Sequence, residues 1–424
     1  MTKRLEWIEE PSRRTPVRHR TQVLVVGGGA AGVTAAVAAA RSGADTILVE
    51  RHGTLGGLAT GGLIALFLTL DDGAGHQVIS GLCQEMTERL AARGAAFFPD
   101  KTQWGSDLEA FLDVQRQWGL VWGSPPHRVR YSVAYDPEAL RAVMAEMVVD
   151  SGAELLLHCW ACEAIRDGDR VRGVVFQSKS GRFAILADVV IDASGDGDIF
   201  ASAGCAHETE KVLPWLWFRV GGVDVDKAQA GGAWCFRTVN DGQVLFPWGA
   251  TERVIRKIDA TNPDDLTFAE LECRRVVMEE FERLRREAPG FERAHLCEIA
   301  RDLGITESRR LSGRYVLARD DMDRPLDDAI GLTGHWTKYG ALYWLPYRSL
   351  LAREFNNLLA AGRCISVDHR THHATKEIPA CMVTGQAAGT AAALAVLRET
   401  TPSALDVASL REELRTQGVL LSPA

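Results

Sequence analysis

In the first part of the chain, two short runs of apolar residues flank a segment that is long enough to form a helix. Residues 23–26 and 47–49 are continuously apolar, and an alanine-rich segment of helical length separates them. Glycines at positions 27, 28, 29 and 32 lie between the first run and that segment. By period, residues 22–50 are therefore predicted to form a strand, a glycine turn, a helix and a second strand that ends in Glu50.

Helical spacing recurs later in the chain. Leu82, Met86 and Leu90 repeat at intervals of four, and Pro137 follows Asp136 at a position that suits the first turn of a helix. The predicted helices cover residues 77–94, 108–118, a segment from 137 onward, 267–286 and 381–397. Residues 171–177 and 183–187 alternate around a short polar turn, which predicts a hairpin, and residues 154–158 and 187–192 read as strands.

Together these elements predict an α/β protein. We expect a Rossmann-like dinucleotide-binding domain with a central parallel sheet and a β-meander, plus an inserted α+β substrate domain. Residues 205–340 break the rhythm of the chain and are rich in tryptophan. The expected boundaries are an arm at 1–20, the first part of the binding domain at 21–204 with a helical insertion at about 76–125, a cap at 205–340, and a return segment at 341–424.

The composition of the chain indicates which partners and which cellular compartment to expect. The net charge of −8 over 424 residues, without a clustered basic run, argues against nucleic acid as a partner. Nine scattered cysteines are typical of reduced intracellular thiols. Arg13-Arg14 precedes an apolar segment, but that segment is the predicted first strand and helix, so cleavage there would destroy the fold. We expect a cytoplasmic protein without a membrane partner, and homo-oligomer formation stays open.

The glycine turn has the spacing of a dinucleotide-binding site. Gly27 permits the tight turn, Gly29 lets the backbone approach a pyrophosphate, and Gly32 allows close packing of helix on strand. The phosphates would lie at the helix N-terminus, where free N–H groups favour anions. Glu50 suits an unphosphorylated ribose, which favours FAD or NAD over NADP. After Glu50, where a helix is expected in a unit that binds only NAD, residues 53–62 are glycine-rich. A loop of this kind resembles that of flavoproteins, and the resemblance favours FAD.

Several further motifs coincide with this pattern. With them the chain resembles the FAD-dependent oxidoreductase family, within the glutathione-reductase-like flavoproteins that carry the two-dinucleotide fold. The resemblance rests on the glycine turn, Gly56-Gly57, residues 191–198, residues 306–315, residues 345–350, residues 361–364 and residues 379–389.

The resemblance implies an FAD in an extended pose. The adenosine ribose would lie at Glu50 and Arg51, the adenine at the backbone of Ala161, and the flavin near the N-terminus of the last long helix, at about residues 380–384, whose dipole stabilises negative charge. The other residues implied to hold the cofactor are Gly27, Gly29, Ala30, Ala31, Gly32, Gly56, Gly57, Leu58, Ser194, Gly195, Asp196, Gly362, Arg363, Thr384 and Ala388.

Candidate catalytic groups gather in the loop predicted before that helix. His369 is at a position where the family usually has histidine, whereas His372, His373 and Glu377 depart from the family pattern. A histidine suits a general base near neutral pH, and we favour His369 first and His372 second. The alternative is a solvated polar loop.

Arginines offer a second set of candidates. Arg348, beside Tyr347, is a candidate clamp for a substrate anion. Arg309 and Arg310 are expected to form internal salt bridges with Glu307 or Asp320. Most of the tryptophans in residues 205–340 are expected to be core.

Missing motifs limit the mechanism. Cys159 and Cys162 form a CxxC without two further ligands at similar spacing, so we expect no metal. No CxxxxC pair follows Gly57, and no second GxGxxG is present. We therefore expect an FAD-dependent dehydrogenase or oxidase that takes a hydride from a small organic metabolite and passes electrons to oxygen or a diffusible acceptor. The alternatives are a C=C reductase and a non-catalytic electron-transfer or sensor subunit.

Overall fold

A seven-stranded sheet forms the centre of the protein. The computed structural model describes residues 7–424. The strand order is β6-β2-β1-β9-β8-β7, and β18 pairs with the last residues of β9, on the edge of β9 opposite to β1. Strands β1 (Val17–Val26), β2 (Thr46–Val49), β6 (Glu154–Leu156), β9 (Gly181–Asp192) and β18 (Leu358–Ala360) run parallel, whereas β7 (Trp160–Asp167), β8 (Arg170–Ser178) and β9 form an antiparallel meander. The predicted α/β class, parallel sheet and meander are confirmed.

The first strand is longer than its apolar run. Apolar residues mark 23–26, but β1 begins at Val17 because its backbone continues to pair with β9, from Val17 opposite Ala184 to Val26 opposite Asp192. The side chains of residues 17–20 are mostly exposed and polar, so their hydrophobic pattern gives no sign of the pairing. Part of the predicted arm is therefore strand.

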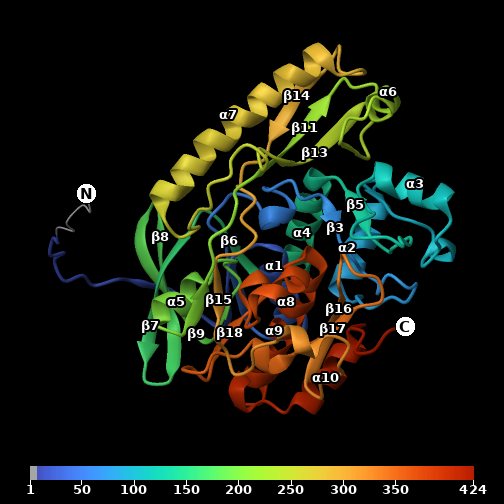
Figure 1. Ribbon diagram of the computed structural model, residues 1–424. Helices are drawn as coiled ribbons and strands as arrows, with labels where there is room; N and C mark the ends of the chain where they lie inside the picture. The colour runs from blue at the N-terminus through green and yellow to red at the C-terminus, as the bar shows by residue number, and fades with distance from the viewer. Residues whose placement is uncertain (1–6) are drawn as a thin grey trace.

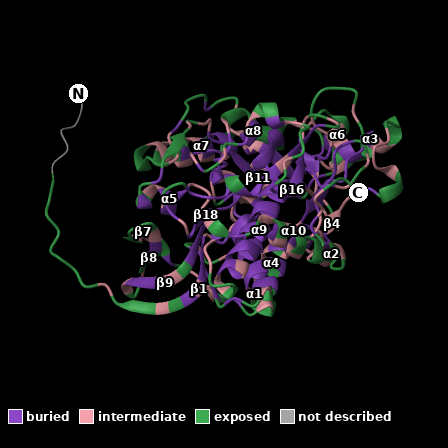
Figure 2. Cartoon of the chain, turned by 90° about the horizontal axis from the view of Figure 1, so that it is seen from below, coloured by how far each residue is buried: buried purple, intermediate pink, exposed green. Residues whose placement is uncertain are grey.

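Two helices pack against each other over one face of the sheet. Helix α1 (Ala30–Arg41) contacts α9 (Ile378–Leu397), and both are largely buried (Figure 2). A Cβ at Gly385 would lie 2.1 Å from the Ala31 carbonyl oxygen, and one at Gly389 would lie 2.0 Å from that of Ala35. Helix α9 has the length and hydropathy of a membrane span, but 78% of that window is buried inside the protein. These glycines are needed for the close helix contact.

The predicted helical insertion lies beside this core. It contains α2 (Leu82–Ala91), α3 (Glu109–Gln117) and a small sheet of β3 (Leu66–Phe67), β5 (Val133–Tyr135) and β4 (Ala96–Phe97). Helix α4 (Pro137–Ser151) begins as expected, because the Asp136 carboxylate accepts hydrogen bonds from the N–H groups of Glu138 and Ala139.

A second sheet covers one side of the molecule. Strands β12 (Phe236–Arg237), β13 (Gln243–Gly249), β11 (Leu216–Gly221) and β14 (His295–Ile299) are adjacent in that order, and the long helix α7 (Pro263–Glu287) lies across them (Figure 1). We call this unit the cap sheet.

A hairpin of β16 (Ala329–Gly334) and β17 (Leu342–Pro346) spans residue 340, where we expected a boundary. The remaining elements are α5 (Asp198–Ala203), β10 (His207–Thr209), α6 (Val225–Ala230), β15 (Arg309–Leu311), α8 (His369–Thr375) and α10 (Val407–Thr416), with short 3-10 turns at Gly57–Ala59, Lys101–Gln103, Arg319–Asp321, Tyr347–Ser349, Gly362–Cys364 and Pro402–Ala404.

Candidate active site

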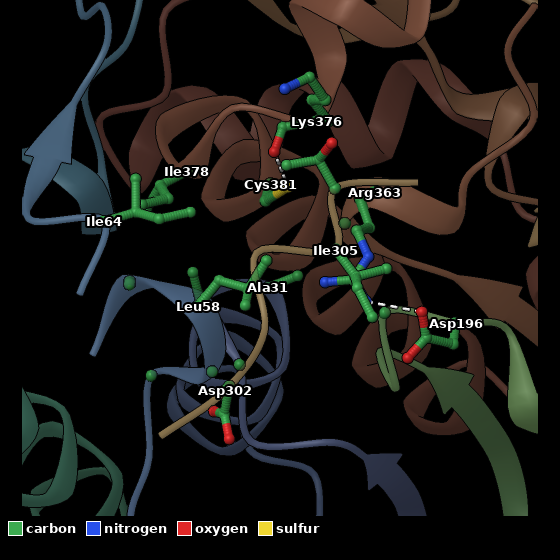
Figure 3. A pocket seen from close by; sticks show the side chains of 18 of the residues that line it. Ala31, Leu58, Ile64, Asp196, Asp302, Ile305, Arg363, Lys376, Ile378 and Cys381 are labelled. Atoms are coloured by element: carbon green, nitrogen blue, oxygen red, sulfur yellow. Dashed lines mark hydrogen bonds and ion pairs between the residues drawn. The ribbon is translucent and has the colours of Figure 1, made fainter. Parts of the chain in front are cut away.

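A cavity of about 600 Å³ opens between the central sheet and the cap sheet. Its lower walls are the segments that follow the carboxyl ends of β1, β2, β9 and β18, the edge at which ligands bind in open α/β sheets. Its other walls come from the cap sheet and from the junction of α8 with α9. Figure 3 shows Ala31 and Leu58 on one side of this space, with Ile64 and Ile378 facing each other farther along it.

The three glycines of the turn have the different roles that the sequence predicts. Gly27 has a φ of +104°, and a Cβ there would lie 2.4 Å from the Ala193 carbonyl oxygen. A Cβ on Gly32 would lie 1.7 Å from the carbonyl oxygen of Gly27, so Gly32 serves packing and is not part of the cavity wall. A Cβ on Gly29 would meet nothing within 4 Å. Gly29 therefore borders open space where α1 begins.

The N-terminus of α1 is available to an anion. Gly29 is its N-cap residue, and no side chain in the described part of the chain caps this helix end. Ala30 and Ala31 line the cavity directly after Gly29. Unpaired N–H groups and the helix dipole favour negative charge at such a position. The cradle therefore fits a pyrophosphate group.

Glu50 is held by the backbone of two loops. Its Oε2 accepts a hydrogen bond from the Gly28 N–H at 2.6 Å, and its Oε1 accepts one from the His52 N–H at 2.7 Å. The side chain is only 7% exposed and lines the cavity. The neighbouring Arg51 guanidinium lies over the ring of Trp160, 5.2 Å from its centroid. This end of the cavity thus presents a fixed carboxylate and a flat aromatic edge, which suits a ribose and an adenine.

An ion pair joins the two later turns. Arg363 Nη2 donates to Asp196 Oδ1 at 2.6 Å (Figure 3). The Ser308 hydroxyl donates to the same oxygen, also at 2.6 Å. Burial alone would raise the pKa of Asp196, but Arg363 and Ser308 hold it below its usual value. Ser194, Gly195 and Gly362 line the cavity beside this pair.

Four of the expected catalytic side chains do not line this cavity. Tyr347 is 1% exposed, and its hydroxyl donates to the Pro402 carbonyl at 2.8 Å. Arg348 donates to Asp328 at 2.9 Å and lies over the ring of Tyr315. Core packing thus occupies Tyr347 and a local ion pair occupies Arg348, and neither side chain lines this cavity.

The two favoured histidines are also in other places. His369 is 61% exposed in its side chain and lies 3.0 Å from Glu307, and His372 is 1% exposed, with Nε2 2.9 Å from the Arg363 carbonyl oxygen. Residues 369–375 form helix α8, capped by Asp368, and not the predicted loop. Successive positions on a helix point in different directions, so one histidine faces solvent and another faces the core.

The histidine that does reach the cavity is His373. It lines the wall with Lys376, one helical turn later, and with Glu377 and Cys381. Burial, with the nearby Lys376 and Lys338, lowers the pKa of His373 to about 4, so its imidazole is neutral at pH 7. On a helix, the i, i+3 spacing of His373 and Lys376 puts both side chains on one face. The sequence pattern predicts a loop here, and in a loop this spacing has no such meaning.

Besides Gly32, three of the implied cofactor residues do not line the cavity. Thr384 and Ala388 are fully buried in α9, where the Thr384 hydroxyl accepts a hydrogen bond from the Gly362 N–H, so they position the turn and do not line the cavity. Helix α9 begins at Ile378, earlier than expected, because Pro379 suits its first turn. Ala161 lies on β7 directly after Trp160, which does line the cavity.

Arg309 and Arg310 form internal ion pairs, as expected. Arg310 pairs with Glu307 at 2.7 Å, but Arg309 pairs with Asp198 at 3.0 Å and not with Glu307 or Asp320. Cys159 and Cys162 are free thiols. Within residues 7–424, no group of three or more histidine, cysteine or acidic side chains has the arrangement of a metal site.

Tryptophans form much of the upper wall. The expectation that most are core holds only in part, because four of the five tryptophans in residues 205–340 line the cavity. The cavity-lining tryptophans are Trp122, Trp160, Trp215, Trp217, Trp248 and Trp336. Trp234, by contrast, is 58% exposed and stacks on Trp248 outside the cavity wall.

Comparison with known proteins agrees with this geometry. The chain is 28% identical over 189 residues to a probable fumarate reductase of Shewanella frigidimarina, covering 41% of this chain and 32% of that protein. It is 26% identical over 196 residues to digeranylgeranylglycerophospholipid reductase 1 of Methanopyrus kandleri, covering 44% and 43%. The matches thus span less than half of either relative.

A solved structure and a family profile extend over more of the chain. The structure of CabE, an aromatic hydroxylase from angucycline biosynthesis, aligns with a TM-score of 0.50 at 16% identity over 95% of this chain and 69% of that one, which shows a shared fold. The profile described as FAD dependent oxidoreductase matches residues 22–246 and 222–414. The protein is therefore an enzyme of the FAD dependent oxidoreductase family, and its cofactor is FAD.

Proposed function

We propose that this enzyme oxidises a small organic substrate bound under the cap sheet, by hydride transfer from a substrate carbon to FAD. FAD, when bound, accepts the hydride, which carries two electrons and one proton. The observation that carries the proposal is His373, a neutral imidazole in the cavity wall without a hydrogen-bonding partner for its ring among the described residues. It can accept the second proton, from a substrate O–H or N–H, as the adjacent C–H bond breaks.

The cofactor would lie along the lower walls. Gly29, Ala30 and Ala31 would bind the pyrophosphate through their N–H groups and the end of α1. Glu50 would accept from the ribose. The flavin would lie beside Gly57 and Leu58, with the start of α9 at its other side. The open space above Gly29 and the uncapped α1 support this orientation.

The lowered pKa of His373 keeps its imidazole in the proton-accepting form at pH 7. A group with a pKa of about 4 is an acceptor of protons at pH 7, and only a small fraction of it is protonated and able to donate. Lys376, on the next turn, pairs with Glu377 at 3.4 Å and is the cationic donor that the reverse reaction would use. His373 is thus deprotonated at pH 7 and can act as a general base.

Reduction of a C=C bond is the second candidate. It is favoured by the names of the two curated relatives, which are both reductases. In this direction the same cavity would hold an unsaturated substrate, and Lys376 would supply the proton while the hydride reached the other carbon.

Anaerobic flavin spectroscopy separates these directions. The FAD-loaded enzyme is mixed with a panel of aliphatic and arylmethyl alcohols and amines, and bleaching of the oxidised flavin absorbance is followed by stopped flow. Bleaching by a panel member supports oxidation. The chemically reduced enzyme is then mixed with enones and other activated alkenes. Reoxidation by alkenes, without bleaching by any reduced compound, would overturn the first proposal in favour of the second.

A further inference from the structure

Four tryptophans enclose the end of the cavity under the cap sheet. The rings of Trp122 and Trp248 are 5.0 Å apart at 80°, those of Trp122 and Trp336 are 5.7 Å apart at 69°, and those of Trp217 and Trp248 are 5.9 Å apart at 79°. All four line the cavity. We call this set the tryptophan chamber. Neighbouring rings are nearly perpendicular, so the chamber has flat aromatic walls in more than one direction.

The four rings come from separate parts of the chain. Trp217 lies on β11 and Trp248 on β13, whereas Trp122 follows α3 and Trp336 follows β16. Trp336 is fixed further, because its indole N–H donates to the His373 carbonyl at 3.0 Å. Rings held by two strands and a hydrogen bond make a preformed site, which binds a rigid ligand at a small cost in conformational entropy.

Aliphatic side chains line the cavity as well. Ile64, Leu66 and Leu68 line the cavity from the segment around β3. Aromatic rings stack in offset or edge-to-face contact with other conjugated rings, and these contacts add to the free energy of apolar burial. A flat conjugated ligand uses the faces of the tryptophans, whereas a bulky saturated one of the same size does not.

The charged side chains Glu270, Lys376 and Glu377, which line the cavity, already have partners. Glu270 pairs with Arg274 at 3.1 Å, and Lys376 pairs with Glu377 at 3.4 Å. A charged ligand would lose its hydration without gaining a free counter-ion among these three lining side chains. His373 is left as the polar group that can accept a hydrogen bond.

We propose that the tryptophan chamber binds an uncharged substrate with a planar, conjugated ring system and one hydroxyl group on a C–H carbon attached to that ring, and that this hydroxyl donates a hydrogen bond to His373. Naphthol has the ring and the hydroxyl but no hydrogen on the hydroxyl-bearing carbon, so it reports binding without hydride transfer. The site is that of the proposed function, so the substrate class rests on that function for the position of the reacting carbon. Binding in the chamber does not require turnover, and it can be measured alone.

Three probes of similar size test the class. Isothermal titration calorimetry on the FAD-loaded enzyme compares naphthol, the saturated bicyclic alcohol decalol, and naphthoate. We expect naphthol to bind at least about tenfold more tightly than either of the others, because one or two aromatic contacts of about 1 kcal/mol each separate it from decalol. Equal or tighter binding of decalol or naphthoate would overturn the proposal.

Two substitutions locate the binding. Trp248→Leu is expected to weaken naphthol binding by about tenfold and decalol binding by less than twofold, and Trp248→Phe is expected to restore most of the loss. The matched control is Trp234→Leu, which removes an indole that stacks on Trp248 from outside the cavity. Circular dichroism and retained FAD report the fold. An equal loss in both variants would place the probe elsewhere.

Failure of the substrate class and failure of the proposed function give different results. If a charged or saturated compound bleaches the flavin while naphthol does not bind, the redox function stands and the class is wrong. If naphthol binds as expected but no planar hydroxylated compound bleaches the flavin, the chamber stands and the oxidation is wrong.

Discussion

Asp196 and Arg363 form an ion pair that bridges the turn after β9 and the turn after β18. Their side chains are 16% and 18% exposed, and Ser308 adds a hydrogen bond to the same carboxylate oxygen. The two turns belong to parallel strands that pair in the sheet, with Ile191 opposite Leu359. The pair therefore fixes the spacing of two walls of the cofactor cavity.

Removing the negative member of this pair should destabilise the protein. We expect Asp196→Asn to lower the free energy of unfolding by about 2 kcal/mol, because it leaves the guanidinium of Arg363 largely buried without a counter-ion. Guanidinium chloride unfolding of the FAD-free protein measures this change. The matched control is Asp328→Asn, whose partner Arg348 is 50% exposed, and we expect at most about 1 kcal/mol there. Equal losses would refute the bridging role.

Substitution of His373 should affect chemistry more than binding. We expect His373→Ala to slow flavin reduction by substrate about 100-fold, which is the lower range for loss of a general base. His369→Ala is the matched control, because it removes an exposed histidine from the same helix. Stopped-flow rates under anaerobic conditions give the comparison. A normal rate in His373→Ala, or a similar loss in both variants, would rule out the assignment.

The pH dependence follows from the lowered pKa of His373. The base is active when deprotonated, so kcat/KM should stay level from about pH 8 down to about pH 5 and fall below that, with an apparent pKa of about 4. An ordinary histidine would place this fall near pH 6.5. The His373→Ala variant should lack the acid limb. A limb between pH 6 and 7 would contradict the prediction.

Two glycine-to-alanine substitutions should distinguish an effect on cofactor binding from an effect on folding. Gly29→Ala should leave the free energy of unfolding of the FAD-free protein within about 0.5 kcal/mol, since its Cβ meets no protein atom, but the methyl group should weaken FAD binding at least about tenfold by entering the anion cradle. Gly385→Ala should destabilise the FAD-free protein by about 3 kcal/mol, because its Cβ would lie 2.1 Å from a backbone oxygen. Unfolding curves and FAD titration distinguish the two. Similar behaviour of both variants would contradict these assignments.

The parts of the fold that the sequence predicted are those with local physical causes. The apolar run before Gly27 and the cap at Asp136 act over a few residues, and the hairpin of β8 and β9 follows from alternation around a short turn. The start of β1 at Val17 depends on pairing with a strand far along the chain, so a local pattern could not reveal it.

The site residues that the sequence revealed likewise belong to a local motif, whereas the others depend on the folded structure. Glu50 and Gly29 were found because the spacing of their motif reflects the shape of a dinucleotide. His373 was missed because a seven-residue helix decides which of three histidines faces the cavity. The tryptophans were read as core because an aromatic side chain in a cavity wall and one in the interior carry the same hydrophobic signal.

The position of β18 and α9 late in the chain has a consequence for biosynthesis. Gly27 and Cys381 line the same cavity, and β18 completes the sheet beside β9. At typical rates of translation, the glycine turn leaves the ribosome on the order of tens of seconds before the last wall of the cradle is made. Over that interval the nascent chain exposes the face of α1 that α9 later covers, so a nascent chain that stalls before α9 would be vulnerable to aggregation and unable to retain its flavin.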